Sequence, residues 1–498
     1  MPNNDKCLNL ADGLTKQASL RPDTTAIHLP ARVVTFGQLE NLVWRTAMFL
    51  NQGGVKTGNV VELTCANELA IIVATLATAR IGATTFSIPI GTPSILRAEM
   101  GATAKAQLLV TDMLDMESTG LPRLLIDLDR IANDAAMTDV TIRNEYPQAP
   151  WLIITGSGST GRPKQIAFTH RVFRARIPLF SDQISPSVND CVASLMHSDF
   201  SSAKHWQLIA LFSGASICLF DRANTNPIEL CRNKQVTILY TAVIHLEQLI
   251  NRLPPGTTNA LSSLRALVPA GSVISDDLRK RVQQTLTQNL YVRYGTNETG
   301  QVTIATPQEM ISNASTVGRP PPGVQVEVVD ANGTKLPMGE IGQIRIQSPG
   351  MIDHYLDDDD ATKHAFRDGW FMPGDLGKFT PDGQLIFIGR ADQMMNMDGI
   401  NIYPAEIETV IARHPAVRDS AAIPLHSEVH QHIPVCAVAL HPGASVTEKE
   451  LLDFAFQRLG SRYPRRIVIL EKLPRTEQGK LLLQQLNQEM AERLQSPL

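Results

Sequence analysis

Small, hydroxylated and glycine residues are concentrated in one stretch that ends with a lysine, Thr155-Gly156-Ser157-Gly158-Ser159-Thr160-Gly161-Arg162-Pro163-Lys164. Glycines let the backbone turn with its N–H groups directed to one side, hydroxyls add donors, and a lysine ammonium adds positive charge. Groups of this kind bind phosphate. We therefore predict a phosphate-binding loop made of Thr155, Ser157, Gly158, Ser159, Thr160, Gly161 and Lys164.

A P-loop of the Walker type is the first alternative. It requires Lys and Ser or Thr directly after the second of two glycines five residues apart, between a strand and a helix. Gly156 and Gly161 have this spacing, but Arg162 and Pro163 precede Lys164. Residues 152–154 and 165–168 both have the composition of strands. We therefore predict a turn between two strands, and on this stretch alone a plain surface turn stays open.

Composition and charge exclude several classes of protein. The 498-residue chain is too long for one hydrophobic core, which predicts two or more domains. A hydrophobic content of 43% with 19% charged residues is typical of globular proteins, and a net charge of -4 argues against nucleic acid as the main partner. The longest apolar run, residues 70–79, is too short to span a membrane and predicts a buried helix.

Two further features indicate the compartment. Residues 1–17 lack the apolar centre of a signal peptide, and the six cysteines show no CxxC spacing. Reduced thiols are typical of cytoplasmic proteins. We therefore expect a cytoplasmic protein without a disulfide framework or a zinc site.

The segment from residue 36 to residue 111 alternates between helical and strand patterns. The patterns predict helices at 39–52, 68–81 and 94–104, and strands at 59–65, 83–89 and 107–111. Such βαβ repetition favours a mostly parallel sheet with helices on its faces. A second series of strands is expected near 216–220, 236–240, 264–269 and 290–294. The fold class is therefore α/β, with ligands expected near the carboxyl ends of the strands.

Further motifs follow the glycine-rich stretch in a fixed order. They are Tyr294-Gly295-Thr296-Asn297-Glu298, Gly369-Trp370-Phe371-Met372-Pro373-Gly374-Asp375, Phe387-Ile388-Gly389-Arg390-Ala391-Asp392-Gln393 and Leu473-Pro474-Arg475-Thr476-Glu477-Gln478-Gly479-Lys480. In this order the chain resembles the adenylate-forming (ANL) superfamily of acyl-CoA and aryl-CoA ligases, stand-alone adenylation enzymes and beetle luciferases. The resemblance covers nearly the whole chain.

The resemblance implies roles for individual residues. Lys480 would contact the substrate carboxylate and the α-phosphate, Glu298 would hold Mg²⁺, Asp375 would bind the ribose, and Asp392 would be the hinge. The residues implied in ATP or AMP binding, beyond the loop, are Gly271, Ser272, Tyr294, Gly295, Thr296, Asn297, Asp375 and Arg390.

Three positions depart from the family pattern. Asn297 and Pro373 stand where threonine is usual, and Asn396 stands where many relatives have a lysine. An asparagine still donates to a phosphate oxygen, or Thr296 takes its place. A role of that lysine in the second half-reaction is not transferred to this chain.

His197 lies in a segment that resembles the gate at the carboxylate substrate, and it is our candidate for that gate, with a structural histidine as the alternative. Amino-acid-activating relatives use an aspartate in this segment to pair the substrate ammonium. Asp199 is close to that position, but counting back from Gly214 places Ser201 there. An amino acid substrate is therefore the minority interpretation.

The family implies a large N-terminal domain, residues 1–390, with two βαβ-type sheet subdomains and a small β-barrel-like region. A small mobile α+β domain, residues 391–498, would carry the catalytic lysine. Lys164, His197, Glu298 and Lys480 are the expected catalytic residues. The domain contents are expectations from the resemblance.

The implied reaction converts a carboxylic acid and ATP into acyl-AMP and pyrophosphate, with Mg²⁺, and then transfers the acyl group to coenzyme A. The acid is expected to be aryl or medium acyl. The phosphopantetheine of a separate carrier protein is the alternative acceptor, and a nucleotide-binding regulatory relative is the non-enzymatic alternative. No fused carrier domain is expected, because the sequence ends soon after Lys480.

Overall fold

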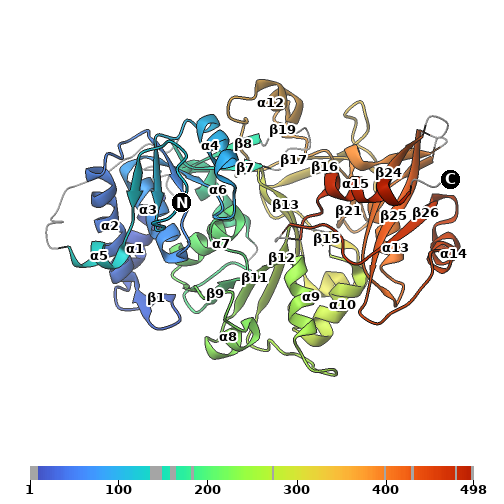
Figure 1. Ribbon diagram of the computed structural model, residues 1–498, viewed down its shortest axis with the longest axis horizontal. Coiled ribbons are helices and arrows are strands. Elements are labelled where there is room, and N and C mark those ends of the chain that lie inside the picture. Colours follow the sequence, from blue (N-terminus) through green and yellow to red (C-terminus); the bar gives the residue numbers. More distant parts are fainter. Residues whose placement is uncertain are drawn as a thin grey trace.

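The computed structural model describes residues 9–134, 149–156, 164–180, 184–271, 274–397, 400–427, 431–476 and 479–494. Figure 1 shows the amino-terminal elements in blue at one end of the long axis and the carboxyl-terminal part in orange and red at the other. The sheets of the central segment lie between them. The chain is a mixed α/β protein, as predicted.

The first parallel sheet has the order β6-β5-β3-β4-β7-β8, and only the β7–β8 pair is antiparallel. Its strands are β3 (Val60–Leu63), β4 (Thr84–Ser87), β5 (Leu108–Thr111), β6 (Arg123–Leu125), β7 (Pro150–Gly156) and β8 (Lys164–Thr169). The helices along this part of the chain are α3 (Glu68–Ile81), α4 (Ser94–Thr103), α5 (Leu128–Asn133) and α6 (His170–Arg176). Every residue of α3 is buried, which confirms the buried helix predicted for residues 70–79.

The second sheet has the order β12-β11-β9-β10-β1-β2 and is parallel except at β2. Its strands are β1 (Thr25–His28), β2 (Val33–Thr35), β9 (Cys191–Ser194), β10 (Ser216–Cys218), β11 (Ile238–Ala242) and β12 (Ala266–Ala270). The helices that accompany it are α1 (Asp12–Leu20), α2 (Phe36–Gln52), α7 (Ser201–Phe212), α8 (Pro227–Asn233), α9 (Val243–Asn251) and α10 (Asp276–Thr285). The two amino-terminal strands β1 and β2 complete this sheet, which was not predicted.

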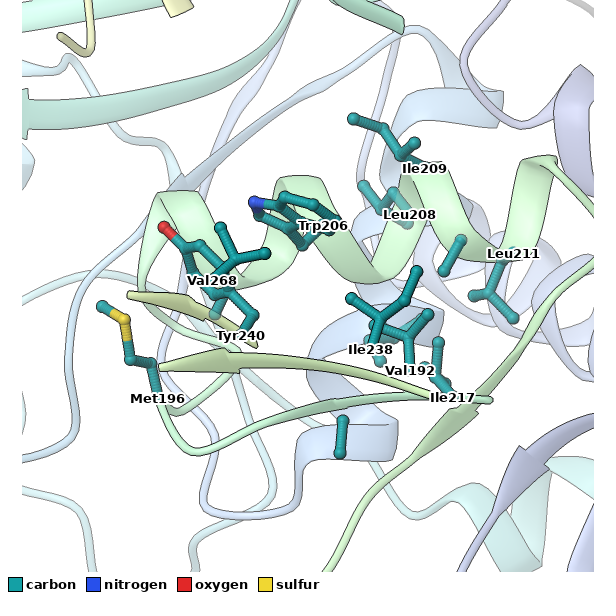
Figure 2. Packing of buried hydrophobic residues seen from close by; sticks show 14 of the residues in the cluster. Val192, Met196, Trp206, Leu208, Ile209, Leu211, Ile217, Ile238, Tyr240 and Val268 are labelled. Atoms are coloured by element: carbon teal, nitrogen blue, oxygen red, sulfur yellow. The ribbon is translucent and has the colours of Figure 1, made fainter. Parts of the chain in front are cut away.

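Figure 2 shows how α7 covers this sheet. Trp206 and Leu208 of α7 lie above side chains that rise from β9 and β11. Trp206 stacks on Tyr240, with 5.3 Å between ring centroids, and both side chains are almost fully buried. Burial of such rings is a large source of stability because each removes much apolar area from water.

The strand predicted near residues 290–294 is present and lies beside the parallel sheet at its start. Strand β13 (Val292–Thr296) forms an antiparallel hairpin with β14 (Gly300–Ala305). A parallel bridge between Leu267 and Leu290, with backbone hydrogen bonds on both sides of it, joins the start of this segment to β12. The prediction of a fourth parallel strand therefore holds at Leu290, whereas residues 292–296 pair with β14, the next strand in the chain.

An antiparallel sheet of seven strands follows, in the place of the expected β-barrel-like region. Its strands are β15 (Thr316–Gly318), β16 (Gln325–Val329), β17 (Gly342–Gln347), β18 (Phe366–Arg367), β19 (Trp370–Phe371), β20 (Asp375–Phe379) and β21 (Leu385–Arg390). Helix α11 (Pro307–Ser312) precedes β15, and helix α12 (Asp359–Ala365) lies between β17 and β18. Strands β20 and β21 pair so that Asp375 lies opposite Arg390.

The carboxyl-terminal part has a sheet of its own. Its strands are β22 (Met395–Met397), β23 (Ile400–Ile402), β24 (Val417–Ser427), β25 (Gln431–Leu440) and β26 (Arg466–Leu470), and its helices are α13 (Pro404–Ile411), α14 (Glu448–Leu459) and α15 (Leu483–Arg493). Its buried apolar residues form two clusters separate from the large cluster that spans Leu10 to Leu385. The boundary between residues 390 and 391 stays a prediction.

Two further sequence predictions concern helices and cysteines. In the described part of the chain, no helix has both the length and the apolar character needed to cross a membrane. The five described cysteines are buried and free, although the sulfur atoms of Cys191 and Cys218 lie 3.4 Å apart. The expectation of free thiols therefore holds for these five residues.

Candidate active site

The two strands predicted on either side of the glycine-rich stretch are present. Strands β7 and β8 pair in antiparallel fashion, with Gly156 opposite Lys164 and Thr155 opposite Gln165. The predicted loop residues Ser157, Gly158, Ser159, Thr160 and Gly161 lie outside the described residues. Lys164 itself begins β8, and its ammonium lies 4.7 Å from the centroid of the Tyr355 ring.

Tyr355 joins Lys164 to Glu298. Its hydroxyl donates a hydrogen bond of 2.8 Å to Oε1 of Glu298. Burial and the neighbouring Glu298 carboxylate raise the pKa of Tyr355, so the phenol stays a donor. The structure thus brings together a cation, a phenol and a carboxylate from three segments.

Sequence reasoning missed Tyr355. It lies in an irregular segment that bridges to β8, where the Leu356 amide donates to the Gln165 carbonyl. Such a segment has no periodic pattern, so the sequence did not reveal that Tyr355 is buried in the large hydrophobic cluster.

The hairpin β13–β14 presents Glu298 at its turn. A Cβ atom on Gly295 would lie 2.3 Å from the Gly300 carbonyl oxygen, so only glycine fits there. The Thr296 hydroxyl lies 3.0 Å from that of Thr299 within the turn. Arg176 stabilises the turn, because its guanidinium donates to the carbonyl oxygens of Asn297 and Glu298.

Glu298 fits the expected magnesium role. Mg²⁺ in nucleotide enzymes is usually held by one or two carboxylates together with substrate phosphate oxygens, rather than by a full protein cage. Glu298 provides one such carboxylate beside Lys164 and Tyr355. Among the described residues, no group of three or more His, Cys, Asp or Glu side chains could hold a metal ion.

A second cluster of polar residues surrounds Asp375. The Tyr294 hydroxyl donates to Oδ2 of Asp375 at 2.6 Å, and the Arg390 guanidinium lies 3.4 Å from Oδ1. Burial raises the pKa of Asp375, while the Tyr294 hydrogen bond and the Arg390 charge act against this rise. Tyr294 and Phe387 are neighbours, with ring centroids 5.7 Å apart. The two oxygens of the Asp375 carboxylate can accept from ribose hydroxyls, and the Tyr294 and Phe387 rings can pack against a base, so the cluster suits a nucleoside.

Gly271 and Ser272 were predicted to line the nucleotide pocket. Gly271 follows β12 with a φ of +93°, a conformation that glycine adopts without strain. Ser272 lies outside the described residues.

The Lys480 segment of the carboxyl-terminal part lies against helix α9. A Cβ atom on Gly479 would lie 3.0 Å from Cβ of Ile244, so the backbone at Gly479 packs directly against the Ile244 side chain. Burial and the positive charge of Arg390 lower the pKa of Lys480. The lysine is therefore within electrostatic reach of the cluster around Asp375.

Two ion pairs stabilise this region. Arg475 pairs with Asp419 at 2.8 Å and donates to the Gly479 carbonyl oxygen, also at 2.8 Å, which holds the turn that carries Lys480. Arg390 pairs with the predicted hinge residue Asp392 at 3.0 Å. Asp392 lies in a short 3₁₀ turn, Ala391–Gln393, between β21 and β22.

His197 is placed next to Asp199, with 2.9 Å between Nδ1 and Oδ1. Burial would lower the pKa of His197, but the hydrogen bond and charge of Asp199 raise it above its ordinary value. Burial lowers the pKa of Lys204 and the charge of Asp199 acts against this, while the Lys204 ammonium donates to the Ser87 hydroxyl. Within the described residues, no hydrogen bond or ion pair joins His197 to Lys164, Glu298 or Lys480.

The comparisons with known proteins identify the class of this chain. It matches the AMP-binding enzyme family over residues 14–356 and the AMP-binding enzyme C-terminal domain over residues 406–480. The chain therefore belongs to the AMP-binding enzyme family, and the resemblance to adenylate-forming enzymes is confirmed.

Individual relatives agree with this class. The 2-succinylbenzoate–CoA ligase of Bacillus licheniformis is 27% identical over 482 residues, which are 94% of this chain and 98% of that protein. ATP-bound MatB from Rhodopseudomonas palustris has a TM-score of 0.87 at 21% identity, covering 98% of this chain and 100% of that one. The O-succinylbenzoate coenzyme A synthetase of Bacillus subtilis in complex with ATP and magnesium ion has a TM-score of 0.84 at 22% identity, covering 95% and 99%. The predicted enzyme class, acid–thiol ligase, and the predicted cofactors ATP, Mg²⁺ and coenzyme A agree with these relatives.

One prediction follows from the His197–Asp199 pair. Replacing Asp199 with asparagine removes the charge that raises the pKa of His197 and leaves the effect of burial, so that pKa should fall below its ordinary value. We expect the histidine to stay neutral to lower pH, as measured by NMR titration of labelled imidazoles in the full chain.

Asp221→Asn, at an exposed aspartate, is the matched control and should leave the pKa of His197 unchanged.

The same Asp199→Asn variant should activate a plain carboxylic acid at a rate within about tenfold of the wild-type rate. Activity confined to amino acids and lost in this variant would contradict our assignment of the acid.

Proposed function

We propose that the chain is an acid–thiol ligase that forms acyl-AMP from an aryl or medium acyl carboxylic acid and then transfers the acyl group to coenzyme A. One observation carries the proposal. The hairpin β13–β14 brings Glu298 to Tyr355, which lies against Lys164, and places Tyr294 against Asp375, so groups suited to phosphate and to a nucleoside lie on one hairpin. We also propose the division at residues 390 and 391, because the hydrophobic clusters on its two sides are separate.

In the first half-reaction, a carboxylate oxygen of the acid attacks the α-phosphorus of ATP, and the bond to the β-phosphate bridging oxygen breaks. Negative charge increases on the phosphate oxygens during this step. Lys164 would stabilise the leaving pyrophosphate, and Lys480 would stabilise the α-phosphate and the incoming carboxylate. Mg²⁺ held by Glu298 would neutralise phosphate charge.

The nucleoside would be held by Asp375, whose oxygens would accept from the ribose hydroxyls in place of Tyr294 and Arg390. Tyr294 would stack on the adenine, and Thr296 and Asn297 at the hairpin turn would donate to phosphate. Gly271 would allow a flat ring to approach the backbone. His197 would lie at the entrance for the carboxylate.

In the second half-reaction, the thiol sulfur attacks the acyl carbon, the anhydride bond to AMP breaks, and the thiol proton is released to solvent. We propose that the segment after Asp392 rotates between the two steps and withdraws Lys480. Hinge motions concentrate the backbone change in few residues. The 3₁₀ turn at Ala391–Gln393 is a short connection of that kind.

The test is pyrophosphate release from ATP with a panel of aryl, acyl and amino acids, followed by addition of coenzyme A or of a carrier protein with its phosphopantetheine. Acid-dependent pyrophosphate release with thioester formation on coenzyme A supports the proposal. Thioester formation on the carrier alone favours the alternative acceptor. Nucleotide binding without any pyrophosphate release would show a regulatory protein.

Replacing Lys164 with alanine should raise the KM for ATP by about tenfold or more, because the lost charge faces pyrophosphate. The KM for the acid should rise less. Steady-state kinetics with each substrate varied in turn measure this. Lys363→Ala, at an exposed lysine of α12, is the control and should change neither constant. Equal increases in both KM values would contradict the proposal that Lys164 binds the leaving pyrophosphate.

A further inference from the structure

The carboxyl-terminal part contacts helices α9 and α10 through two segments that lie far apart in its sequence. In one of them, the backbone of Gly479 packs against the side chain of Ile244 on α9. In the other, Arg413 forms an ion pair with Asp276, the first residue of α10, with 3.6 Å between Nη2 and Oδ2. Figure 1 shows α9 and α10 next to each other. Both contacts belong to the arrangement in which the turn that carries Lys480 lies against α9.

This interface is not held by a shared apolar core. The large cluster of buried apolar residues ends at Leu385, and the two clusters of the carboxyl-terminal part begin at Met395 and Ala421. Away from the hinge, the ion pair of Arg413 with Asp276 is the one that joins the two parts among the described residues. Domains joined without a large hydrophobic interface move relative to one another. Polar contacts can therefore decide how long this arrangement lasts.

Asp276 is held in place by its own helix. It lies in the first turn of α10, where a carboxylate interacts favourably with the helix dipole, and the Ser315 hydroxyl donates to its Oδ2 at 3.3 Å. Arg413 has no other ion-pair partner in the described part of the chain. The Arg413 side chain is 54% exposed and that of Asp276 is 21% exposed, so salt should screen the pair.

A second charged residue of the same surface, Glu247 of α9, gives no comparable attraction. It pairs with Arg281 of α10 at 3.7 Å. Burial raises the pKa of Glu247, the charges of Arg281 and Arg418 act against this rise, and the charge of Asp419 adds to it. Arg418 and Asp419 both belong to β24, so attraction and repulsion oppose one another at Glu247. Arg413 and Asp276 carry opposite charges and attract.

We propose that the ion pair of Arg413 with Asp276 sets the balance between the two poses of the enzyme, because it stabilises the arrangement described here, the adenylating pose, and breaks before transfer to the thiol. This inference rests on the proposed function, in which Lys480 acts in the first half-reaction. Arg413 and Asp276 are then positioning residues that act through the placement of Lys480. An exposed ion pair changes an equilibrium constant by about two- to fivefold, which suits a contact that breaks in every turnover.

The first test measures the pose itself, by fluorescence energy transfer in the full chain. Labels are attached at Lys363→Cys on α12 and Gln457→Cys on α14, which are exposed positions in the two parts, and the chain without these substitutions gives the background. Arg413→Gln should shift the equilibrium away from the adenylating pose by about two- to fivefold at low salt. The shift should disappear at about 1 M salt, where exposed charges are screened.

The second test is single-turnover kinetics of each half-reaction. Arg413→Gln should speed transfer from supplied acyl-AMP to coenzyme A by about two- to fivefold, and it should slow acyl-AMP formation by no more than this factor. Arg413→Lys keeps the charge and should retain more of the wild-type balance than Arg413→Gln does. Arg493→Gln, at an exposed arginine of α15, is the control for the loss of one positive charge.

The acidic partner has a matched control in the next residue. Asp276→Asn should act as Arg413→Gln does. Asp277→Asn removes a carboxylate from the same first turn, but Asp277 lies 3.9 Å from Arg281 of its own helix, so this variant should leave both half-reactions unchanged. Equal effects of the two asparagine variants would show that helix stability is the cause and would overturn the inference.

The outcomes also separate this inference from the proposed function. If Arg413→Gln changes neither the energy transfer nor the rate of thiol transfer, the inference is overturned and the ligase proposal stands. If the wild-type chain forms no acyl-AMP with any acid, the proposed function fails, and the assignment of the two poses to half-reactions fails with it. A salt-sensitive shift in energy transfer would then show only that the ion pair holds the two parts together.

Discussion

Replacing Lys480 with alanine is expected to slow acyl-AMP formation by a factor of about 10²–10³, the effect of losing one charge directed at a transition state. Transfer from supplied acyl-AMP to coenzyme A should stay within about threefold of the wild-type rate. In the proposed mechanism Lys480 stabilises the α-phosphate during the first half-reaction, and the rotation takes it away before transfer. Single-turnover kinetics of each half-reaction measure the two effects.

Lys472→Ala, at an exposed lysine in the same part of the chain, is the control and should change neither half-reaction. Asp392→Pro is the complementary variant, since a fixed φ at the hinge should permit acyl-AMP formation and slow transfer. Parallel loss of both half-reactions in a folded Lys480→Ala protein would contradict the two-pose mechanism. Lys480 would then be a structural residue.

Replacing Arg176 with methionine should lower the free energy of unfolding by about 3–5 kcal/mol, because buried carbonyl oxygens that lose a donor cost ~1–3 kcal/mol each. Its guanidinium donates at 2.8 Å to Gly350, at 2.8 Å to Asn297 and at 3.1 Å to Glu298. Urea unfolding followed by circular dichroism measures the loss.

The same change should weaken ATP-dependent activity, because Arg176 holds the turn that carries Glu298. Arg174→Met is the matched control, since Arg174 lies exposed on the same helix α6 and should alter stability by less than about 0.5 kcal/mol. An unchanged unfolding midpoint in Arg176→Met would show that other contacts hold the turn.

Local signals predicted individual helices well. The pattern at residues 68–81 gave the bounds of α3, because Asn67 caps the first turn with its side chain and Gly82 ends the helix with a φ of +82°. The strand-turn-strand at Lys164 was predicted for a similar reason, since Pro163 and the flanking apolar runs leave no helix there. Signals of this type are contained in a few neighbouring residues.

Pairing between distant segments was not predictable in the same way. A strand pattern at residues 290–294 does not reveal whether its partner is β12 or β14, and the antiparallel hairpin was missed. The hydrogen bond from Lys204 to Ser87 depends on the rotation of α7 about its axis, which the sequence pattern does not fix because most residues of this helix are buried. The roles of Lys164, His197, Glu298 and Lys480 came from family motifs and stay predictions.

The place of β1 in the second sheet bears on how the chain is made. Ile27 pairs with Ile217, so a strand that leaves the ribosome early has its neighbour only after the first sheet has been synthesised. Until then its hydrogen-bonding edge is open, and such edges promote association between nascent chains. Parallel pairing over so long a separation is also slow, because the loop must close before contacts form. Expression of this enzyme should therefore depend on chaperones that shield residues 25–35 during translation.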